Sequence, residues 1–227
     1  MCGLLGIYGE KIEEKVFVDA MNLQKHRGPD DYGYYENKNI KLGHRRLSII
    51  DLSSRSKQPM SSEDGSITVV FNGEIFNYKE LRELLINKGY KFKTSSDTEV
   101  LMNSYHYYKE KCLDFFIGMF SFAIYDASDD SIFIARDRLG VKPLYYKNNG
   151  QFVFSSEIKS ILKMFKNTAP IDINSVSSYL SFRSPTQQST FFNGIKQLAP
   201  AHYIKFKNKK INIVRYWDLS KSLSLSR

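Results

Sequence analysis

Cys2 has the most distinctive chemistry in this sequence, because it directly follows the initiator methionine. Its side chain is small enough for Met1 to be trimmed, which leaves a thiol and a free α-amine on one residue. An α-amine has a pKa of about 7.7 to 8.0 and a cysteine thiol one of about 8.5, so the amine can act as general base near neutral pH. The position therefore indicates a nucleophile that carries its own base. The alternative is a small buried hydrophobe at the start of a strand, and position alone leaves both open.

The residues around Cys2 predict elements that bury the N-terminus. Residues 2 to 8 form a short apolar run ended by Gly9, which is typical of a buried strand. Apolar side chains at helical spacing then predict a helix over roughly residues 12 to 25. After β-prone runs between 32 and 50, residues 67 to 71 predict a strand that stops at the turn dipeptide Asn72-Gly73.

In the rest of the chain, strands and helices occur in groups rather than in strict alternation. Helical spacing covers 78 to 88 and 97 to 108, and Ser95, Ser96 and Asp97 supply capping side chains ahead of the second of these helices. The later ranges are strands over 119–125, 131–135, 144–146 and 151–154 and helices over 157–165 and 173–182. This grouped order predicts an α+β fold of antiparallel sheets covered by helices, rather than a doubly wound parallel sheet.

Composition and charge describe one large globular domain. The chain has 227 residues, 42% apolar content, a formal charge of +9 and only two cysteines, Cys2 and Cys112. Its Lys and Arg residues are scattered rather than clustered in a stripe, which argues against a nucleic-acid partner. Two cysteines exclude a disulfide framework, and no signal peptide or apolar run of about 18 residues appears. We therefore expect a soluble, cytoplasmic protein without a membrane partner.

Five motifs in the first half of the chain resemble one enzyme family. They are, in order, Cys2-Gly3, HRGPD at 26–30, HRRLS at 44–48, FNGEI at 71–75 and SDTE at 96–99. In this order and at these separations they resemble the class II glutamine amidotransferases, a branch of the N-terminal nucleophile hydrolases. The resemblance implies a four-layer αββα fold with two stacked, mainly antiparallel sheets, and hydrolysis of glutamine through a Cys2 thioester.

Motifs in the second half resemble the asparagine synthetase branch. They are GMFSFA at 118–123, ARDRLG at 135–140, KPLYY at 142–146 and FSSEIK at 154–159. The resemblance implies a glutamine amidotransferase domain over residues 2 to 218 and the start of a linker over 219 to 227. It also implies a C-terminal synthetase domain, outside this chain, that uses ATP and magnesium to activate aspartate. Glutamine and that domain are the expected partners, and a homodimer is kept as a further candidate.

Each role that the resemblance assigns must also make physical sense. Attack on an amide carbonyl builds negative charge on oxygen, and the resemblance assigns its stabilisation to the Asn72 side chain and the Gly73 N–H. Free glutamine carries an α-carboxylate and an α-ammonium. Arg46 matches the arginine that holds the first, and Asp97, with Glu74 beside it, matches the site of the second. The segment from Arg46 to Ile50 resembles the strand that lines the substrate, and the resemblance implies that Leu47 binds the substrate. Ser48, Ile49 and Ile50 are expected to offer backbone contacts rather than chemistry.

Each of these residues also has a purely structural interpretation. Asn-Gly is foremost a turn dipeptide, Asp97 could be a helix cap, and an isolated arginine such as Arg46 is usually a surface cation. We interpret His26 and His44 as loop-stabilising, because Cys2 already carries its own base. Cys112 is expected to be an ordinary helix cysteine, and the segment 136–146 to support the fold and the domain contact.

No cofactor is expected in this chain. Its histidines and cysteines lack metal-ligand spacing, and neither phosphate-binding glycine template is present. Three functions therefore remain to be separated. The first is a glutaminase that supplies ammonia for asparagine synthesis, and the second is the same glutaminase serving another acceptor, such as a sugar acid or a glycan. The third is a non-catalytic interaction module.

Overall fold

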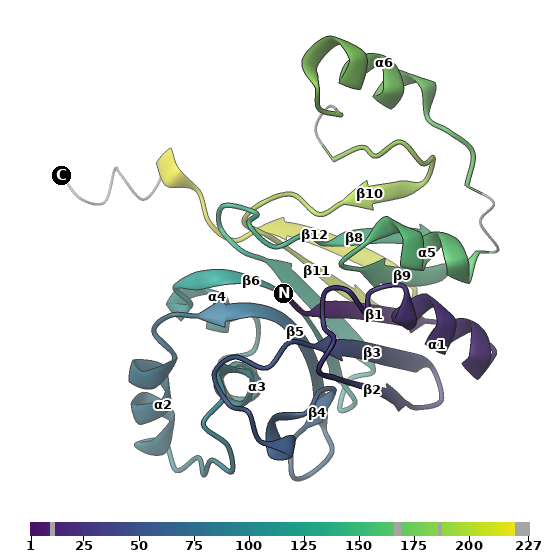
Figure 1. Ribbon diagram of the computed structural model, residues 1–227. Helices are drawn as coiled ribbons and strands as arrows, with labels where there is room; N and C mark the ends of the chain where they lie inside the picture. The colour runs from purple at the N-terminus through teal and green to yellow at the C-terminus, as the bar shows by residue number, and fades with distance from the viewer. Residues whose placement is uncertain (10–11, 166–168, 186–187, 221–227) are drawn as a thin grey trace.

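The computed structural model of the chain describes residues 1–9, 12–165, 169–185 and 188–220. These residues form two six-stranded sheets that stack face to face, with helices against both outer faces (Figure 1). All strand pairs within the two sheets are antiparallel. The predicted α+β fold of antiparallel sheets covered by helices is therefore confirmed, in four layers.

The first sheet holds the N-terminal strand near its centre, in the order β10-β8-β9-β1-β3-β2. Its strands are β1 (Gly3–Tyr8), β2 (Asp31–Glu36), β3 (Ile40–Arg46), β8 (Tyr145–Asn149), β9 (Gln151–Ser155) and β10 (Ile195–Gln197). Helices α1 (Glu14–Asn22) and α5 (Ile158–Met164) cover its outer face, where Phe17 and Ile161 pack with Leu5 and Ile7 of β1. The first residues of the chain are thus built into the fold, as the apolar run predicted.

The second sheet has the order β12-β11-β7-β6-β5-β4. Its strands are β4 (Met60–Ser61), β5 (Ile67–Ile75), β6 (Gly118–Asp126), β7 (Ser131–Arg136), β11 (His202–Lys207) and β12 (Lys210–Arg215). Its outer face is covered by α2 (Tyr78–Ile86), α3 (Asp97–Tyr108) and α4 (Cys112–Phe115). Two short 3-10 turns, η1 (Ser54–Ser56) and η2 (Lys109–Lys111), lie in the connections.

Strand alternation decides which side chains lie between the two sheets. Leu4 of β1, Leu42 of β3 and Val70 of β5 belong to one buried cluster between the sheets. Because side chains on a strand alternate between its faces, residues an even number of positions away point the same way. This alternation directs His44 and Arg46 of β3 and Asn72 of β5 into the space between the sheets.

Strand β5 corrects one expectation from the sequence. It does not stop at Asn72-Gly73 but continues to Ile75, with Asn72 opposite Ser121 and Gly73 opposite Phe120 of β6. A Cβ on Gly73 would lie 2.2 Å from the Met119 carbonyl oxygen, so glycine is required here for the close approach of two strands. The turn interpretation of this dipeptide is therefore wrong.

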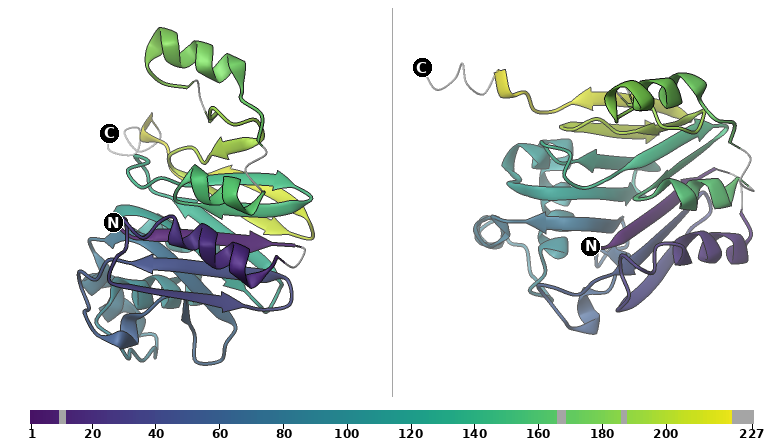
Figure 2. Two further views of the ribbon diagram at one scale, coloured as in Figure 1. Left: turned by 45° about the vertical axis from the view of Figure 1, so that its right-hand side comes forward. Right: turned by 45° about the horizontal axis from the view of Figure 1, so that its top comes forward.

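Helix α6 (Ile173–Phe182) stands apart from the helices on both outer faces, as Figure 2 shows. Its bounds match the predicted range, and Asp172 caps its first turn by accepting from the N–H groups of Asn174 and Ser175. Residues 221–227 of the predicted linker lie outside the described residues. None of the described helices is both long enough and apolar enough to cross a membrane.

Candidate active site

A cavity of about 320 Å³ brings most of the predicted site residues together. Cys2, Arg46, Asn72, Gly73 and Asp97 all line it, although Cys2 directly precedes β1 and the others belong to β3, β5 and α3. Figure 1 shows the N-terminus of the chain beside the start of β1. The remaining lining residues are Met1, Leu47, Ile49, Ile50, Asp51, Ser56, Gln58, Phe71, Glu74, Ser96, Thr98, Met119 and Lys142.

The Cys2 thiol lies against the backbone of Leu47. The Leu47 N–H donates to Cys2 Sγ at 3.4 Å, and the thiol in turn lies 3.6 Å from the Leu47 carbonyl oxygen. Burial raises the pKa of the Cys2 thiol, while the Leu47 N–H and the Arg46 charge act in the opposite direction. The thiol therefore needs a base in order to attack at neutral pH. Met1 precedes Cys2 in the structure, so the α-nitrogen of Cys2 is here a peptide nitrogen.

Arg27 fixes the backbone of the nucleophile, a role that the sequence did not indicate. Its Nε donates to the Cys2 carbonyl oxygen at 2.9 Å, and its Nη1 lies 3.3 Å from Glu157 Oε1. His26 Nε2 lies 2.9 Å from the same carboxylate oxygen. The prediction that His26 stabilises a loop agrees with this contact.

Asn72 and Gly73 present hydrogen-bond donors that little else uses. Asn72 is 1% exposed, its Nδ2 reaches Ser121 Oγ only at 3.5 Å, and its Oδ1 has no partner among the described residues. On β5, the N–H groups of Phe71 and Ile75 point away from β6 and donate to side chains of Gln58 and Asp97. Because an antiparallel ladder alternates, the Gly73 N–H between them points the same way, toward the cavity.

Arg46 is buried and braced by the loop that follows it. Its Nη1 donates to the Ser53 carbonyl oxygen at 3.1 Å, and its Nη2 donates to the Asp51 carbonyl oxygen. The Asp51 carboxylate accepts from the N–H and hydroxyl of Ser95, next to α3. Arg46 is therefore not a surface cation. A guanidinium has five donors, so it retains N–H groups for a ligand carboxylate.

Asp97 is the first residue of α3, but it is not the helix cap. Ser96 is the N-cap, and its hydroxyl accepts from the Glu99 N–H at 3.3 Å. Asp97 Oδ2 instead accepts from the Ile75 N–H at 3.1 Å. Burial raises the pKa of the Asp97 carboxyl from 3.8 to about 6, and the charge of Glu74 adds to the rise. A cation bound here would relieve that cost, because an opposite charge favours the ionised carboxylate.

The segment after Arg46 only partly follows the prediction. β3 ends at Arg46, so residues 47 to 50 are not a continuation of the strand. Leu47, Ile49 and Ile50 line the cavity. Ser48 does not line it, and its N–H donates to Asp30 Oδ2 at 2.8 Å.

Several lining residues were missed by sequence reasoning. Gln58 lies in a polar stretch that predicts only a loop, and Lys142 lies in a segment assigned to fold support. That segment does support the fold, since Arg136 donates to the carbonyl oxygens of Gly140, Lys142 and Leu198. His44 also differs from its interpretation. It sits within β3, fully buried, and its Nε2 lies 2.9 Å from the Phe71 carbonyl oxygen.

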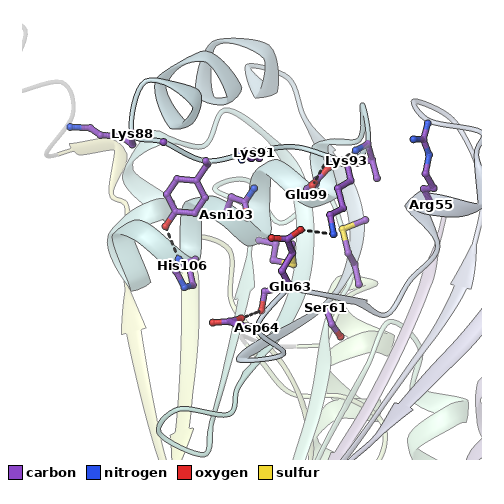
Figure 3. A pocket seen from close by; sticks show the side chains of 16 residues that line it. Arg55, Ser61, Glu63, Asp64, Lys88, Lys91, Lys93, Glu99, Asn103 and His106 are labelled. Carbon is purple, nitrogen blue, oxygen red and sulfur yellow. Dashed lines mark hydrogen bonds and ion pairs between the residues drawn. The ribbon is translucent and has the colours of Figure 1, made fainter.

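A second, larger cavity of about 730 Å³ is lined in part by residues around the start of α3 (Figure 3). Thr94 and Glu99 line it, while Ser96 and Asp97 line the smaller one. Several of its polar side chains pair with one another. Lys93 is paired with Glu63, the Tyr90 hydroxyl lies 2.6 Å from His106 Nδ1, and Glu99 accepts from Thr94. The predicted site residues therefore collect in the smaller of the two cavities.

No group of three or more His, Cys, Asp or Glu side chains in the described part of the chain could hold a metal ion. Cys112 is fully buried in α4, as expected for an ordinary helix cysteine. The smaller cavity offers a thiol beside hydrogen-bond donors, together with the charged side chains of Arg46, Lys142, Asp51, Glu74 and Asp97.

Comparison with known proteins places this geometry in context. A family model described as a glutamine amidotransferase domain matches residues 1–217. Asparagine synthetase [glutamine-hydrolyzing] 3 of Bacillus subtilis is 39% identical over 228 residues, which cover 96% of this chain and 37% of that protein. Amidase chyE of Penicillium rubens is 36% identical over 202 residues, which cover 88% of this chain and 29% of that protein. The chain thus spans about a third of the length of these relatives.

A solved structure shares the fold. The glutamine phosphoribosylpyrophosphate amidotransferase of Bacillus subtilis superimposes with a TM-score of 0.71 at 19% identity, covering 95% of this chain and 49% of that one. At this identity the likeness concerns the fold alone. It confirms the predicted N-terminal nucleophile hydrolase fold with two stacked antiparallel sheets.

Proposed function

The chain belongs to the family of class II glutamine amidotransferase domains, and from this premise we propose that Cys2 hydrolyses glutamine to glutamate and ammonia through a thioester. The observation that carries the proposal is the cavity in which Cys2, Asn72, Gly73, Arg46 and Asp97 meet. These residues come from three separate elements and from the start of the chain. Each supplies one requirement of attack on the side-chain amide of a free amino acid.

The first step makes the thioester. The α-amine of Cys2, freed by removal of Met1, takes the thiol proton, and Sγ attacks the amide carbon of glutamine. The carbonyl oxygen becomes negative and is stabilised by the Asn72 amide and the Gly73 N–H. The carbon–nitrogen bond then breaks as the protonated α-amine returns its proton to the leaving nitrogen. Ammonia departs and a γ-glutamyl thioester remains on Cys2.

The second step restores the thiol. Water loses a proton to the α-amine and attacks the thioester carbon, with the same two donors stabilising the oxyanion. The carbon–sulfur bond breaks, the thiolate regains a proton from the α-amine, and glutamate leaves. No redox partner or metal enters this balance.

Recognition of free glutamine is assigned to the opposite charges in the cavity. Arg46 is held by two backbone carbonyls in an orientation that leaves other N–H groups for the α-carboxylate. Asp97, helped by Glu74, would receive the α-ammonium. Leu47, Ile49 and Ile50 would enclose the substrate. A peptide-bound glutamine lacks both free charges, so the site should reject it.

We further propose that the ammonia serves an amidation reaction outside these 227 residues. The likeness to asparagine synthetase 3 supports aspartate as the acceptor, activated with ATP and magnesium by a C-terminal synthetase domain. The comparable likeness to a protein named amidase supports a second candidate, the same glutaminase serving a different acceptor. Under either reading, residues 2–218 make up the glutaminase and 219–227 begin the linker.

Glutamate release separates these functions. We expect the chain with Cys2 as its first residue to convert glutamine to glutamate and Cys2→Ala to show no release above background. Equal release by both would reject the thioester mechanism, and no release by either would favour an interaction module. The full-length protein supplied with glutamine, ATP and aspartate should then form asparagine. Glutamate release without asparagine would favour another acceptor.

A further inference from the structure

The backbone N–H and carbonyl oxygen of one residue next to the oxyanion donors are held by side chains rather than by a neighbouring strand. The Phe71 N–H donates to Gln58 Oε1 at 2.7 Å, and the Phe71 carbonyl oxygen accepts from His44 Nε2 at 2.9 Å. Both groups point to the edge of β5, where β4 is paired only as far as Val69. Phe71 immediately precedes Asn72 and Gly73. The orientation of the Phe71 backbone therefore helps to set the direction of both donors.

We propose that His44 and Gln58 are positioning residues that fix the oxyanion donors by holding both backbone polar groups of Phe71, its N–H and its carbonyl oxygen. The inference rests on the proposed glutaminase function and adds two residues to it. Neither needs to touch the reacting atoms. Oxyanion donors have to be held within about 0.5 Å of the productive geometry, which a free strand edge does not ensure.

His44 reaches Phe71 across the space between the two sheets. It lies on β3 of the first sheet, opposite Leu4 of β1, while Phe71 lies on β5 of the second. The contact thus ties the strand next to the nucleophile to the strand that carries the oxyanion donors. Gln58 connects this hydrogen-bond network to α3, because its Nε2 donates to Thr98 Oγ1 at 3.2 Å. Thr98 follows Asp97, so the ammonium site belongs to the same network.

The chemical state of His44 follows from its partner. A carbonyl oxygen can only accept, so Nε2 must carry the hydrogen. Burial lowers the pKa of His44 to about 4, so the ring is neutral at pH 7 and holds a single N–H. Its Nδ1 has no hydrogen-bond partner among the described residues. The ring therefore contributes one donated hydrogen bond and no acid–base chemistry.

Two amide substitutions separate this hydrogen bond from simple packing. The side-chain nitrogen of glutamine lies as many bonds from Cα as His Nε2, and that of asparagine as many as His Nδ1. His44→Gln therefore keeps a donor aimed at the Phe71 carbonyl oxygen, whereas His44→Asn withdraws it. Both variants place a neutral amide of similar polarity in the same buried position. A role in packing alone predicts that the smaller asparagine and the glutamine differ in stability but not in the rate per folded molecule.

The experiment measures kcat and KM for glutamine, the inhibition constant of glutamate and the thermal midpoint, using the whole chain with Cys2 as first residue. For His44→Asn we expect kcat to fall about 10- to 100-fold, as for a small misplacement of catalytic groups. KM and the glutamate inhibition constant should stay within about threefold, because the clamps at Arg46 and Asp97 are untouched. His44→Gln should keep kcat within about threefold of the parent.

A matched control checks that lost stability alone does not mimic this pattern. Ile132 belongs to the same buried cluster between the sheets but lies on β7, opposite Tyr125, away from the cavity. Ile132→Val should lower the thermal midpoint without changing kcat per folded molecule. Gln58→Met loses both the acceptor for the Phe71 N–H and the hydrogen bond to Thr98, so its kcat should fall as in His44→Asn.

The outcomes distinguish this inference from the proposed function. If His44→Asn and His44→Gln hydrolyse glutamine equally well or equally badly, the hydrogen bond has no positioning role and the inference is wrong. A rise in KM with unchanged kcat would also overturn it, because the residues would then act on substrate binding. If the parent chain itself releases no glutamate, the proposed function fails and this inference fails with it.

Discussion

The two halves of β5 differ in what their outer edge is bonded to. From Ile67 to Val69 the edge is paired with β4 and with the turn that follows it. From Phe71 to Ile75 no strand of the described residues covers the edge, and Gln58 and Asp97 take two of the N–H groups. The Gly73 N–H between them faces the cavity. Where the neighbouring strand ends, the Gly73 N–H on this edge is thus left facing the cavity as a donor for a ligand.

Unused hydrogen-bonding capacity, rather than cavity volume, distinguishes the candidate site from the larger cavity. The larger cavity has more than twice the volume, yet Lys93, Glu63 and Glu99 there are paired within the protein. In the smaller cavity Asn72 Oδ1 has no partner among the described residues, and burial raises the pKa of the Asp97 carboxyl. A buried group without a partner costs free energy, and a substrate that pairs with it recovers that cost.

The largest expected effect is on the uncovered half of β5. Asn72→Ala removes one oxyanion donor and should lower kcat for glutamine about 10²- to 10³-fold while KM changes little. Steady-state glutamate release checks this. An unchanged kcat would mean that the uncovered edge is not where the oxyanion forms, and the contrast between the two halves would lose its functional meaning.

Asp97→Asn should stabilise the protein while it weakens glutamine binding. The raised pKa of about 6 means that the folded state holds this proton more tightly than the unfolded state. Folding stability from this group is present below about pH 3.8 and is lost as the pH rises to about 6. Above pH 6 the variant should therefore be more stable than the parent by on the order of 2 kcal/mol.

Urea unfolding at pH 5 and pH 8 measures this difference, which should be larger at pH 8. The parent's kcat/KM should also fall below about pH 6, where Asp97 takes up a proton and can no longer pair with an ammonium. A variant that is less stable than the parent at pH 8 would show that the Asp97 carboxylate is not a cost to the fold.

The smallest effect is expected on the covered half. Thr68 lies on the same strand and the same face as Asn72, and its hydroxyl lies 2.9 Å from Ser61 Oγ of β4. Thr68→Val removes this hydrogen bond and should cost about 1 kcal/mol of stability. The rate of glutamine hydrolysis per folded molecule should stay within about twofold. A rate loss comparable to that of Asn72→Ala would show that the two halves are not functionally distinct.

Much of the fold could be predicted because local patterns and tertiary structure agree. The helices around 78–86, 97–108 and 173–182 have both helical spacing and recognisable boundaries, and β6, β7 and β9 are short apolar runs. Cys2, Arg46, Asn72, Gly73 and Asp97 could be named from their motifs, and all five line one cavity. Their motifs are distinctive because each contains polar residues inside an otherwise buried strand or at a helix start.

What could not be predicted depends on contacts between distant elements. Asn72-Gly73 reads locally as a turn, and only pairing with β6 keeps it extended. The hydrogen-bond partner of His44 lies on the opposite sheet. Gln58 can bond the edge of β5 because the pairing with β4 ends at Val69. Ser48 was expected at the substrate, but Asp30 holds its backbone elsewhere. No residue pattern within a single segment encodes these arrangements.

The central claim is that Cys2 acts as an N-terminal residue, with its own α-amine as base. The most direct test is a chain fused behind a cleavable leader, assayed for glutamate release before and after cleavage leaves Cys2 first, with intact mass confirming each form. We predict that glutamine hydrolysis appears only after cleavage. Equal hydrolysis by the form whose Cys2 nitrogen remains in a peptide bond would contradict the account.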